Sequence, residues 1–386
     1  MNNIPYITRG KHGGYSECID MLRFPLAILV VFVHGFGPEI DFGKLHASGL
    51  VGVAIYDYVR LFFSSVLASC AVPLFFLFSG FLFFHKVDSF DSKGYLQKIH
   101  SRIHTLLIPY ILWIVLMILL TLVLKVGGVM LHGKPWSGIP AFFETNGWWH
   151  LFWDCNVWGE SKNWMGILVH NSGPFLLPFW YMRDLIVMVI LSPVIYFLIK
   201  KMRCFFLILL IALYALDVKA SFISGSFNIA VLFFSMGAYW GVMKQDFVYS
   251  LWKFRYVISP LAIFFIICQT YLEGSNDGIS KFIYPWMVIF ESFFVIILAS
   301  TLCRNYRLFS LNKKLASTSF FIYAFHPFIL VYVIKIWQVI NVNSFLMIIS
   351  YFGAPLTCVV VCVGCYWVLS KWQPSLLGIL IGKRKM

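Results

Sequence analysis

The chain has 386 residues, of which 60% are hydrophobic and only 12% are charged, whereas an ordinary soluble domain carries about 25% charged residues. This composition excludes a soluble globular protein and predicts an integral membrane protein. The formal net charge of +14 is spread over many segments and forms no dense basic run, so a nucleic-acid-binding protein is excluded as well.

Ten apolar runs along the chain are long enough to cross a bilayer, which takes roughly 20 residues. Each is predicted to be a helix, because a single segment inside a membrane can pair its backbone groups only in that form. The sequence therefore predicts an all-α integral membrane protein, with a single domain over residues 1–386 and a bundle of about ten transmembrane helices. The expected spans are 21–38, 62–84, 105–126, 178–199, 203–219, 226–243, 256–272, 282–303, 317–340 and 345–370.

Most Lys and Arg residues lie in the segments that share one side of the membrane with the two termini. By the positive-inside rule, both termini are therefore expected in the cytoplasm. In this orientation residues 371–386 form a cytoplasmic tail.

The first predicted span, CIDMLRFPLAILVVFVHGFG, carries two polar residues, Arg23 and His34. Eleven positions bring them within about 20° of each other on one helix face, with their backbones roughly 16 Å apart along the axis. Arg23 either extends to phospholipid headgroups or clamps phosphate oxygens of an anionic donor that enters from the cytoplasm. His34 lies deeper and either bonds a neighbouring helix or accepts a proton from a hydroxyl nucleophile.

Residues 127–177 form the one long loop of the prediction, and they lie on the outer side of the membrane. Tryptophan faces stack on the apolar faces of sugar rings, but tryptophan is also expected at membrane surfaces. Two interpretations follow, an acceptor-binding lid in which Trp148 and Trp149 contact the substrate, and an interfacial belt. Six of the fourteen tryptophans of the chain lie in this loop, namely Trp136, Trp148, Trp149, Trp153, Trp158 and Trp164.

Arg183 and Asp184 open the fourth predicted span at the outer surface. They form either an interfacial ion pair, with Trp180 and Tyr181 as belt residues, or a contact with the substrate. The sequence does not decide between the two.

Two further polar residues lie inside later spans. Glu291 is mid-span, where an unpaired carboxylate is very costly, so it is either protonated, paired with a cation such as Arg23, or in contact with water. His326 lies at a depth close to that of His34. It either meets the same cavity or is a structural histidine at the kink that Pro327 introduces.

The nine cysteines are scattered and form neither a disulfide framework nor a zinc-binding pattern. Cys362 and Cys365 make a CxxC inside an apolar helix and are interpreted as small packing residues. No metal site is expected.

Five stretches in chain order resemble acyltransferase family 3, which includes membrane O-acetyltransferases of bacterial surface polysaccharides. The resemblance implies an acyl-coenzyme A co-substrate, most simply acetyl-coenzyme A, and a hydroxyl of a glycan or glycolipid as acceptor, with no permanently bound cofactor. It also implies a multi-pass protein of the bacterial inner membrane. The five stretches are the Arg-x10-His arrangement of the first span, VPLFFLFSGFLFF (72–84), RIHTLLIPYILW (102–113), PFWYMRDLIV (178–187) and SFFIYAFHPFIL (319–330).

The resemblance assigns the essential roles to Arg23 and His34, with His34 either a general base or the carrier of the acyl group. The basic inner segment with Lys98 and Arg102 is then expected to bind the phosphates of coenzyme A, although ordinary positive-inside charge explains it too. Gly80 in the FSGF stretch is interpreted as a residue of close helix packing. The acyl group, the acceptor and the oligomeric state are not determined by the sequence.

Two other classes of function were weighed. A transporter or flippase of a glycan lipid or small metabolite also uses many helices and a polar path, but no repeat halves or paired broken helices are visible. A membrane sensor or scaffold leaves the polar residues His34 and His326 without a purpose. An O-acyltransferase is therefore the leading hypothesis.

Overall fold

The computed structural model describes residues 14–35, 53–87, 90–155, 161–164, 167–170, 173–216, 227–272, 278–339 and 344–383. These residues are helical except for loops and one hairpin, in which β1 (Ser161–Trp164) pairs antiparallel with β2 (Ile167–His170). The α-helices are α1 (Tyr15–His34), α3 (Val53–Leu61), α4 (Ala71–Phe84), α5 (Ser92–Arg102), α6 (Ile108–His132), α7 (Gly138–Asn146), α8 (Trp180–Ile190), α9 (Ser192–Met202), α10 (Cys204–Ala215), α11 (Phe227–Val242), α12 (Phe247–Lys253), α13 (Arg255–Leu272), α14 (Gly278–Leu302), α15 (Tyr306–Ala316), α16 (Ser319–Gln338), α17 (Ser344–Trp372) and α18 (Pro374–Leu380). Two π-helical turns, η1 (Phe62–Leu67) and η2 (Ile103–Leu107), and two 3₁₀ turns, η3 (His150–Phe152) and η5 (Leu177–Phe179), connect some of them.

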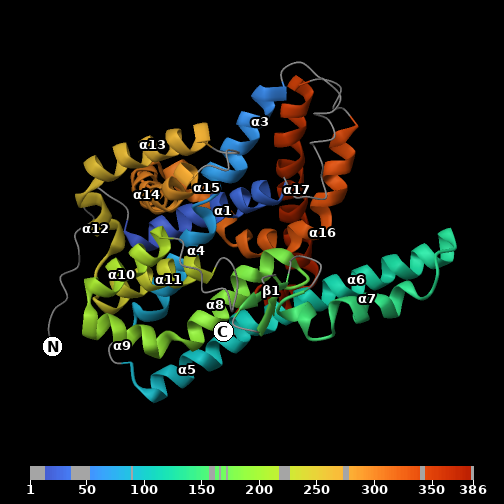
Figure 1. The fold of residues 1–386 in the computed structure, drawn as a ribbon, viewed down its shortest axis with the longest axis horizontal. Coiled ribbons are helices and arrows are strands. Elements are labelled where there is room, and N and C mark those ends of the chain that lie inside the picture. Colours follow the sequence, from blue (N-terminus) through green and yellow to red (C-terminus); the bar gives the residue numbers. More distant parts are fainter. Residues whose placement is uncertain are drawn as a thin grey trace.

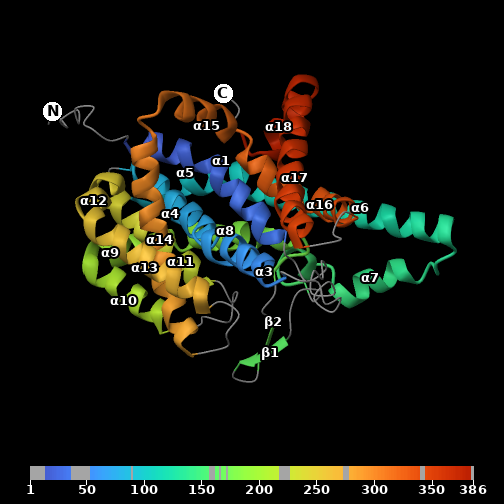
Figure 2. The same ribbon diagram turned by 90° about the horizontal axis from the view of Figure 1, so that it is seen from above.

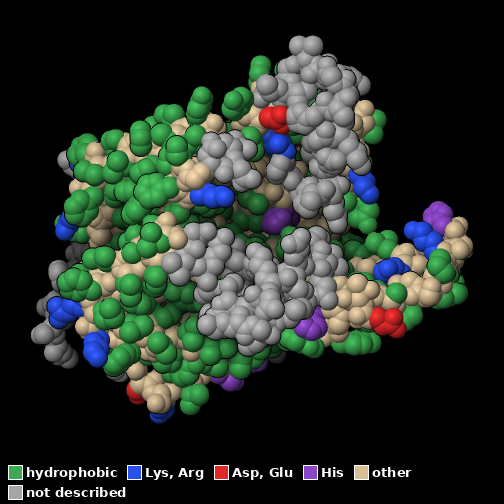
Figure 3. Space-filling view, in the orientation of Figure 1, with side chains coloured by type: hydrophobic (Ala, Val, Ile, Leu, Met, Phe, Trp, Pro, Cys, Tyr) green, Lys and Arg blue, Asp and Glu red, His purple; other side chains and the backbone are tan. Residues whose placement is uncertain are grey.

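The described helices include six stretches that are long and apolar enough to cross a bilayer, or seven if the bent pair α8 and α9 is one span. Helices α10 and α11 are apolar but shorter. Helix α1 has 20 residues and carries Glu17 and Asp20 in addition to Arg23. Hydrophobic side chains cover much of the described surface on the face drawn in Figure 3, and the protein is a multi-pass membrane protein.

Three predicted boundaries are corrected by the structure. The span predicted over 178–199 is not one helix, because it bends by 62° between α8 and α9. Pro193 stands in the first turn of α9, and a proline there cannot continue the hydrogen-bond ladder of a preceding helix. The expected loop 127–177 begins with the last turn of α6 and contains α7 and the hairpin. In Figure 1, α6 and α7 extend together from the body as an arm.

The expected cytoplasmic tail 371–386 is also structured in the part that is described. Helix α18 packs against α6, where the indole Nε1 of Trp113 donates a hydrogen bond of 2.9 Å to the carbonyl of Leu380. Gly382 follows with a φ of 63°, a conformation that costs glycine no steric strain. The C-terminal segment is therefore part of the packed body.

Helix α1 lies against α4, α14, α15, α16 and α17. Figure 2 shows it running alongside α4 through the middle of the molecule. A second, smaller apolar cluster surrounds the C-terminal half of α1, with Val31 and Phe32 of α1, Ile322 of α16 and Tyr351 of α17 among its buried members. Helix α1 therefore packs both against α4, which is close to it in sequence, and against helices from the C-terminal part of the chain.

The closest helix contact joins α4 and α11 through two glycines. A Cβ atom on Gly80 would stand 2.1 Å from the carbonyl oxygen of Phe234, and one on Gly237 would stand 1.9 Å from that of Leu77. Small residues permit this kind of approach between membrane helices. The packing interpretation of Gly80 is therefore confirmed.

We expect Gly237→Ala to destabilise the protein by about 1–3 kcal/mol, the usual range for overpacking of a close contact. The added methyl group meets backbone atoms, which cannot turn aside as a flexible side chain can. Thermal unfolding of the purified protein in detergent measures the effect. Gly364→Ala in α17 is the control, because nothing lies within 4 Å of its Cβ position, and an equal loss in both variants would contradict the prediction.

Candidate active site

The structure brings His34 and His326 together. His34 ends α1, His326 belongs to α16, and their ring centroids are 5.3 Å apart with an interplanar angle of 34°. His326 is fully buried, while His34 is half-buried. The contact with the His34 ring fits a shared location, and the bond of His326 to the preceding turn of α16 fits a structural histidine at the Pro327 kink, so the geometry is compatible with both interpretations.

The hydrogen bonding of His326 defines which ring nitrogen faces outward. Its Nδ1 lies 3.1 Å from the carbonyl oxygen of Ile322. A carbonyl can only accept, so Nδ1 carries the proton and the neutral ring keeps its lone pair on Nε2. Among the described residues no hydrogen-bond partner of Nε2 is found. The histidine pair therefore includes a nitrogen that can accept a hydrogen bond.

Polar groups also fix the end of α1 that carries His34. The hydroxyl of Ser64, in the π-helical turn η1, donates to the carbonyl of Phe32 at 2.8 Å and lies 2.7 Å from the hydroxyl of Tyr351. The last carbonyls of a helix lack partners within the helix, and this bond supplies one. Ser64 and Tyr351 were not predicted from the sequence, because π-helical turns have no simple sequence pattern, although such turns are frequent at functional sites.

Arg23 lies near the middle of α1, about three turns before His34, and is half-buried. Its Nη1 is 3.4 Å from Oδ1 of Asp20, one turn earlier. Arg23 and Arg102 both interact electrostatically with the hydroxyl of Tyr181, which is 3.3 Å from Oγ of Ser79. Arg23 and Arg102, which are both expected to bind the donor, therefore act electrostatically on the same residue, Tyr181.

Tyr181 is an interior residue rather than a belt residue. Its ring packs edge-on against Phe76 at 4.7 Å and lies 5.9 Å from Tyr323. Its position beside Arg23 and Arg102 was not anticipated from the sequence, since only the folding of α8 against α4 brings it there.

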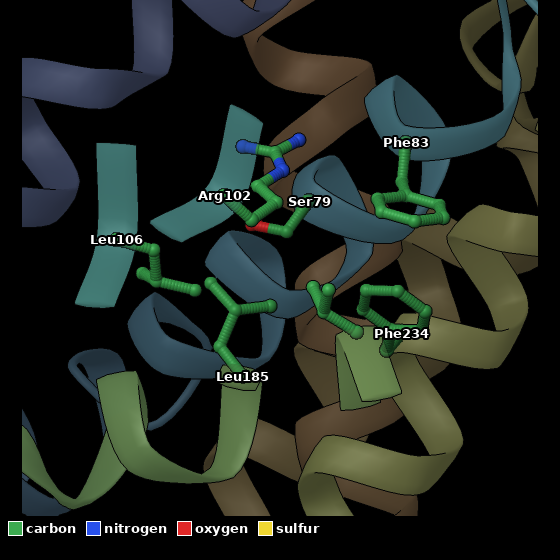
Figure 4. Close-up of a pocket in the computed structure, with 7 residues that line it drawn as sticks. Ser79, Phe83, Arg102, Leu106, Leu185 and Phe234 are labelled. Atoms are coloured by element: carbon green, nitrogen blue, oxygen red, sulfur yellow. The ribbon is translucent and has the colours of Figure 1, made fainter. Parts of the chain in front are cut away.

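Lys98 and Arg102 both lie over the ring of Phe83, with the Lys98 Nζ at 5.5 Å and the Arg102 Cζ at 5.8 Å from its centroid. Arg102, Ser79 and Phe83 line a cavity of about 10 Å³, with Leu106 and Leu185 at its apolar side (Figure 4). That volume holds about one water molecule. The side chains are close to one another, but the cavity does not accommodate any part of coenzyme A as it stands.

Arg183 and Asp184 form the ion pair that one of the two interpretations expected, but both side chains are fully buried in the protein. The Arg183 Nε donates to Oδ1 of Asp184 at 2.9 Å, and Nη1 donates to the carbonyl of Trp153 at 2.6 Å. The segment that contains Trp153 covers both residues. The position of Arg183 within its own predicted span does not show which other segment of the chain packs over it.

Glu291 is fully buried in α14. Its Oε2 accepts a hydrogen bond of 2.7 Å from the hydroxyl of Ser69, which lies in the break between η1 and α4. Arg23 is not its partner, since the ion pair of Arg23 is with Asp20. Among the described residues Oε1 of Glu291 has no hydrogen-bond partner.

Trp148 and Trp149 follow α7 and are 71% and 61% exposed. Trp148 stacks on Phe143 at 4.1 Å, and Trp149 lies 4.0 Å from the ring of His150. One face of each ring is thus supported by the protein. Trp158 lies outside the described residues.

Within the described part of the chain, no group of three or more His, Cys, Asp or Glu side chains is arranged to hold a metal ion. Cys362 is buried and Cys365 half-buried in α17.

A family model described as an acyltransferase domain matches residues 16–367. The chain is also similar to succinoglycan biosynthesis protein ExoH of Rhizobium meliloti (strain 1021), with 22% identity over 96% of this chain and 92% of ExoH. No solved structure matches the chain significantly. Because the family match extends from α1 into α17, the protein belongs to this acyltransferase family, acyltransferase family 3.

Proposed function

We propose that this protein is an O-acyltransferase of the bacterial inner membrane. It moves an acyl group, acetyl in the simplest case, from cytoplasmic acyl-coenzyme A to a hydroxyl of a cell-surface glycan or glycolipid precursor. The observation that carries the proposal is the contact of His34 with His326 at the C-terminal end of α1, the helix that also carries Arg23. The similarity to a succinoglycan biosynthesis protein supports a polysaccharide-related acceptor.

In the proposed reaction the acceptor hydroxyl gives its proton to the imidazole of His34 as its oxygen attacks the thioester carbonyl carbon. The C–S bond then breaks, and the coenzyme A thiolate takes the proton from the imidazolium. No net proton is released. Nε2 of His326, which bonds none of the described residues, is available beside His34 to accept a hydrogen bond from a second hydroxyl of the acceptor.

The donor is proposed to enter from the cytoplasmic side. Arg23, Lys98 and Arg102 bind its phosphates, since guanidinium groups suit bidentate phosphate contacts. Eleven residues of helix separate Arg23 from His34 by roughly 16 Å, a distance that the pantetheine arm of coenzyme A can cross. Because the cavity at Arg102 is small, donor binding requires movement of the side chains around Phe83.

The proposed topology places both termini in the cytoplasm, with about ten transmembrane helices forming a single domain over residues 1–386. Helices α1, α10 and α11 are proposed to cross the membrane in addition to the six long apolar stretches and the bent pair α8 and α9. Trp148 and Trp149 then lie on the outer side, where they bind the acceptor. No permanent cofactor is proposed, and the lipid bilayer is the surrounding partner.

The central test is coenzyme A release by the purified protein with candidate glycan acceptors, together with mass spectrometry of surface polysaccharides from cells with and without the chain.

For His34→Ala we expect a loss of kcat of about 10²–10⁴-fold, the typical contribution of a general base. His132→Ala, an exposed histidine at the end of α6, is the matched control. A wild-type rate in the His34 variant would exclude the catalytic assignment.

Arg23→Ala is expected to raise the KM for acyl-coenzyme A more than it lowers kcat, because Arg23 binds the phosphates and not the reacting atoms. Initial rates at varied donor concentration measure this. Arg255→Ala replaces an arginine that stacks between Trp252 and Tyr256 and should leave the donor KM unchanged. An unaltered donor KM in the Arg23 variant would argue against the clamp.

Trp148→Ala and Trp149→Ala are each expected to raise the acceptor KM by about two- to tenfold, since stacking of an aromatic ring contributes about 0.5–1.5 kcal/mol. The donor KM should not change. Trp136→Ala is the control, because Trp136 is exposed to a similar degree and lies before α7. An equal effect of all three variants would favour a membrane belt over acceptor binding.

A further inference from the structure

The outer loop returns to the body at a paired segment, which we call the loop base (Leu151–Cys155 and Gly173–Phe179). The backbone N–H of Phe175 donates to the carbonyl of Leu151 at 2.8 Å, and the N–H of Cys155 donates to the carbonyl of Gly173 at 2.9 Å. The two passages of the chain are therefore joined to each other where they meet the membrane helices.

Three helices hold the loop base through its carbonyl groups. Tyr110 of α6 donates its hydroxyl proton to the carbonyl of Phe152. Tyr323 of α16 donates to the carbonyl of Pro178 at 2.5 Å. Arg183 of α8 supplies the third bond, to the carbonyl of Trp153. Irregular backbone among apolar helices needs such donors, because an unpaired carbonyl is costly there.

The ion pair of Arg183 with Asp184 lies at the centre of these bonds. Both side chains are fully buried, and Asp184 interacts electrostatically with Tyr110 and with Tyr323. The guanidinium also lies 5.6 Å from the ring of Trp153. A buried charge is tolerated only with good partners, so the pair and the loop base stabilise each other.

The same contacts lead to the histidine pair. The ring of Phe179 stacks on Tyr323 at 5.4 Å and 4°. Tyr323 stands one helical turn before His326, whose Nδ1 bonds the carbonyl of Ile322 in that turn. In the other direction, the loop base begins at Leu151, two residues after Trp149. It therefore connects the exposed tryptophans to the turn of α16 that holds His326.

We propose that Arg183 and Asp184 are positioning residues for the acceptor. They do not contact it, but they hold the loop base so that the glycan bound at the outer loop is presented to His34 and His326. This inference rests on the proposed transferase function and deepens it, because it assigns acceptor affinity to a buried ion pair and two tyrosine hydroxyls.

The most conservative test is Tyr110→Phe and Tyr323→Phe, which remove one hydroxyl each and keep the ring packing. Arg183→Lys and Asp184→Asn are the stronger variants. For each we expect an acceptor KM raised about three- to tenfold, a donor KM unchanged, and faster amide hydrogen exchange in peptides covering the loop base. Tyr95→Phe is the matched control, since its hydroxyl also bonds a backbone carbonyl, that of Ile190, at 3.1 Å but lies away from the loop base.

Two results would overturn the proposal. One is unchanged hydrogen exchange in the loop base of Tyr110→Phe and Tyr323→Phe. The other is faster exchange with an unchanged acceptor KM, which would make the bonds purely structural. Failure of the proposed function is recognised separately, as absence of transfer by the wild-type protein with every acceptor, and the exchange measurements do not depend on activity.

Discussion

Polar groups that lie among apolar helices must find partners inside the protein, because the bilayer interior offers no water. In the described part of this chain many such partners are backbone carbonyls freed by breaks in the helices. Ser64 bonds the carbonyl of Phe32, Tyr323 that of Pro178, and Arg183 that of Trp153. These bonds fix the irregular segments, and the irregular segments border the candidate site.

Under the proposed function, helix α1 separates the two chemical tasks of an acyltransferase along its length. Its N-terminal half carries Arg23, which, like Arg102, interacts electrostatically with Tyr181. Its C-terminal end carries His34 against His326, within the smaller apolar cluster. In the proposed mechanism a single helix therefore sets the distance between donor binding and chemistry, which would otherwise depend on loops.

The segment over residues 127–177 is more closely tied to the helical body than a detached lid. Its base is bonded to three helices, and one of them is α16 with His326. The C-terminal segment is likewise packed, with Leu380 bonded to Trp113 of α6. Both segments join α6 to distant parts of the chain, and both depend on hydrogen bonds to carbonyl oxygens.

The sequence by itself determined the class of protein and the approximate positions of its apolar helices, because burial in lipid leaves a long hydrophobic run in the chain for each span. It also placed Arg23 and His34 on one helix face, since helical spacing is a local property, and it gave the family resemblance. Only the tertiary structure decided the contacts between helices. The meeting of His34 with His326, the burial of Arg183 and Asp184, and the Ser69 partner of Glu291 each join residues far apart in sequence. No local pattern records which faces of two helices pack together.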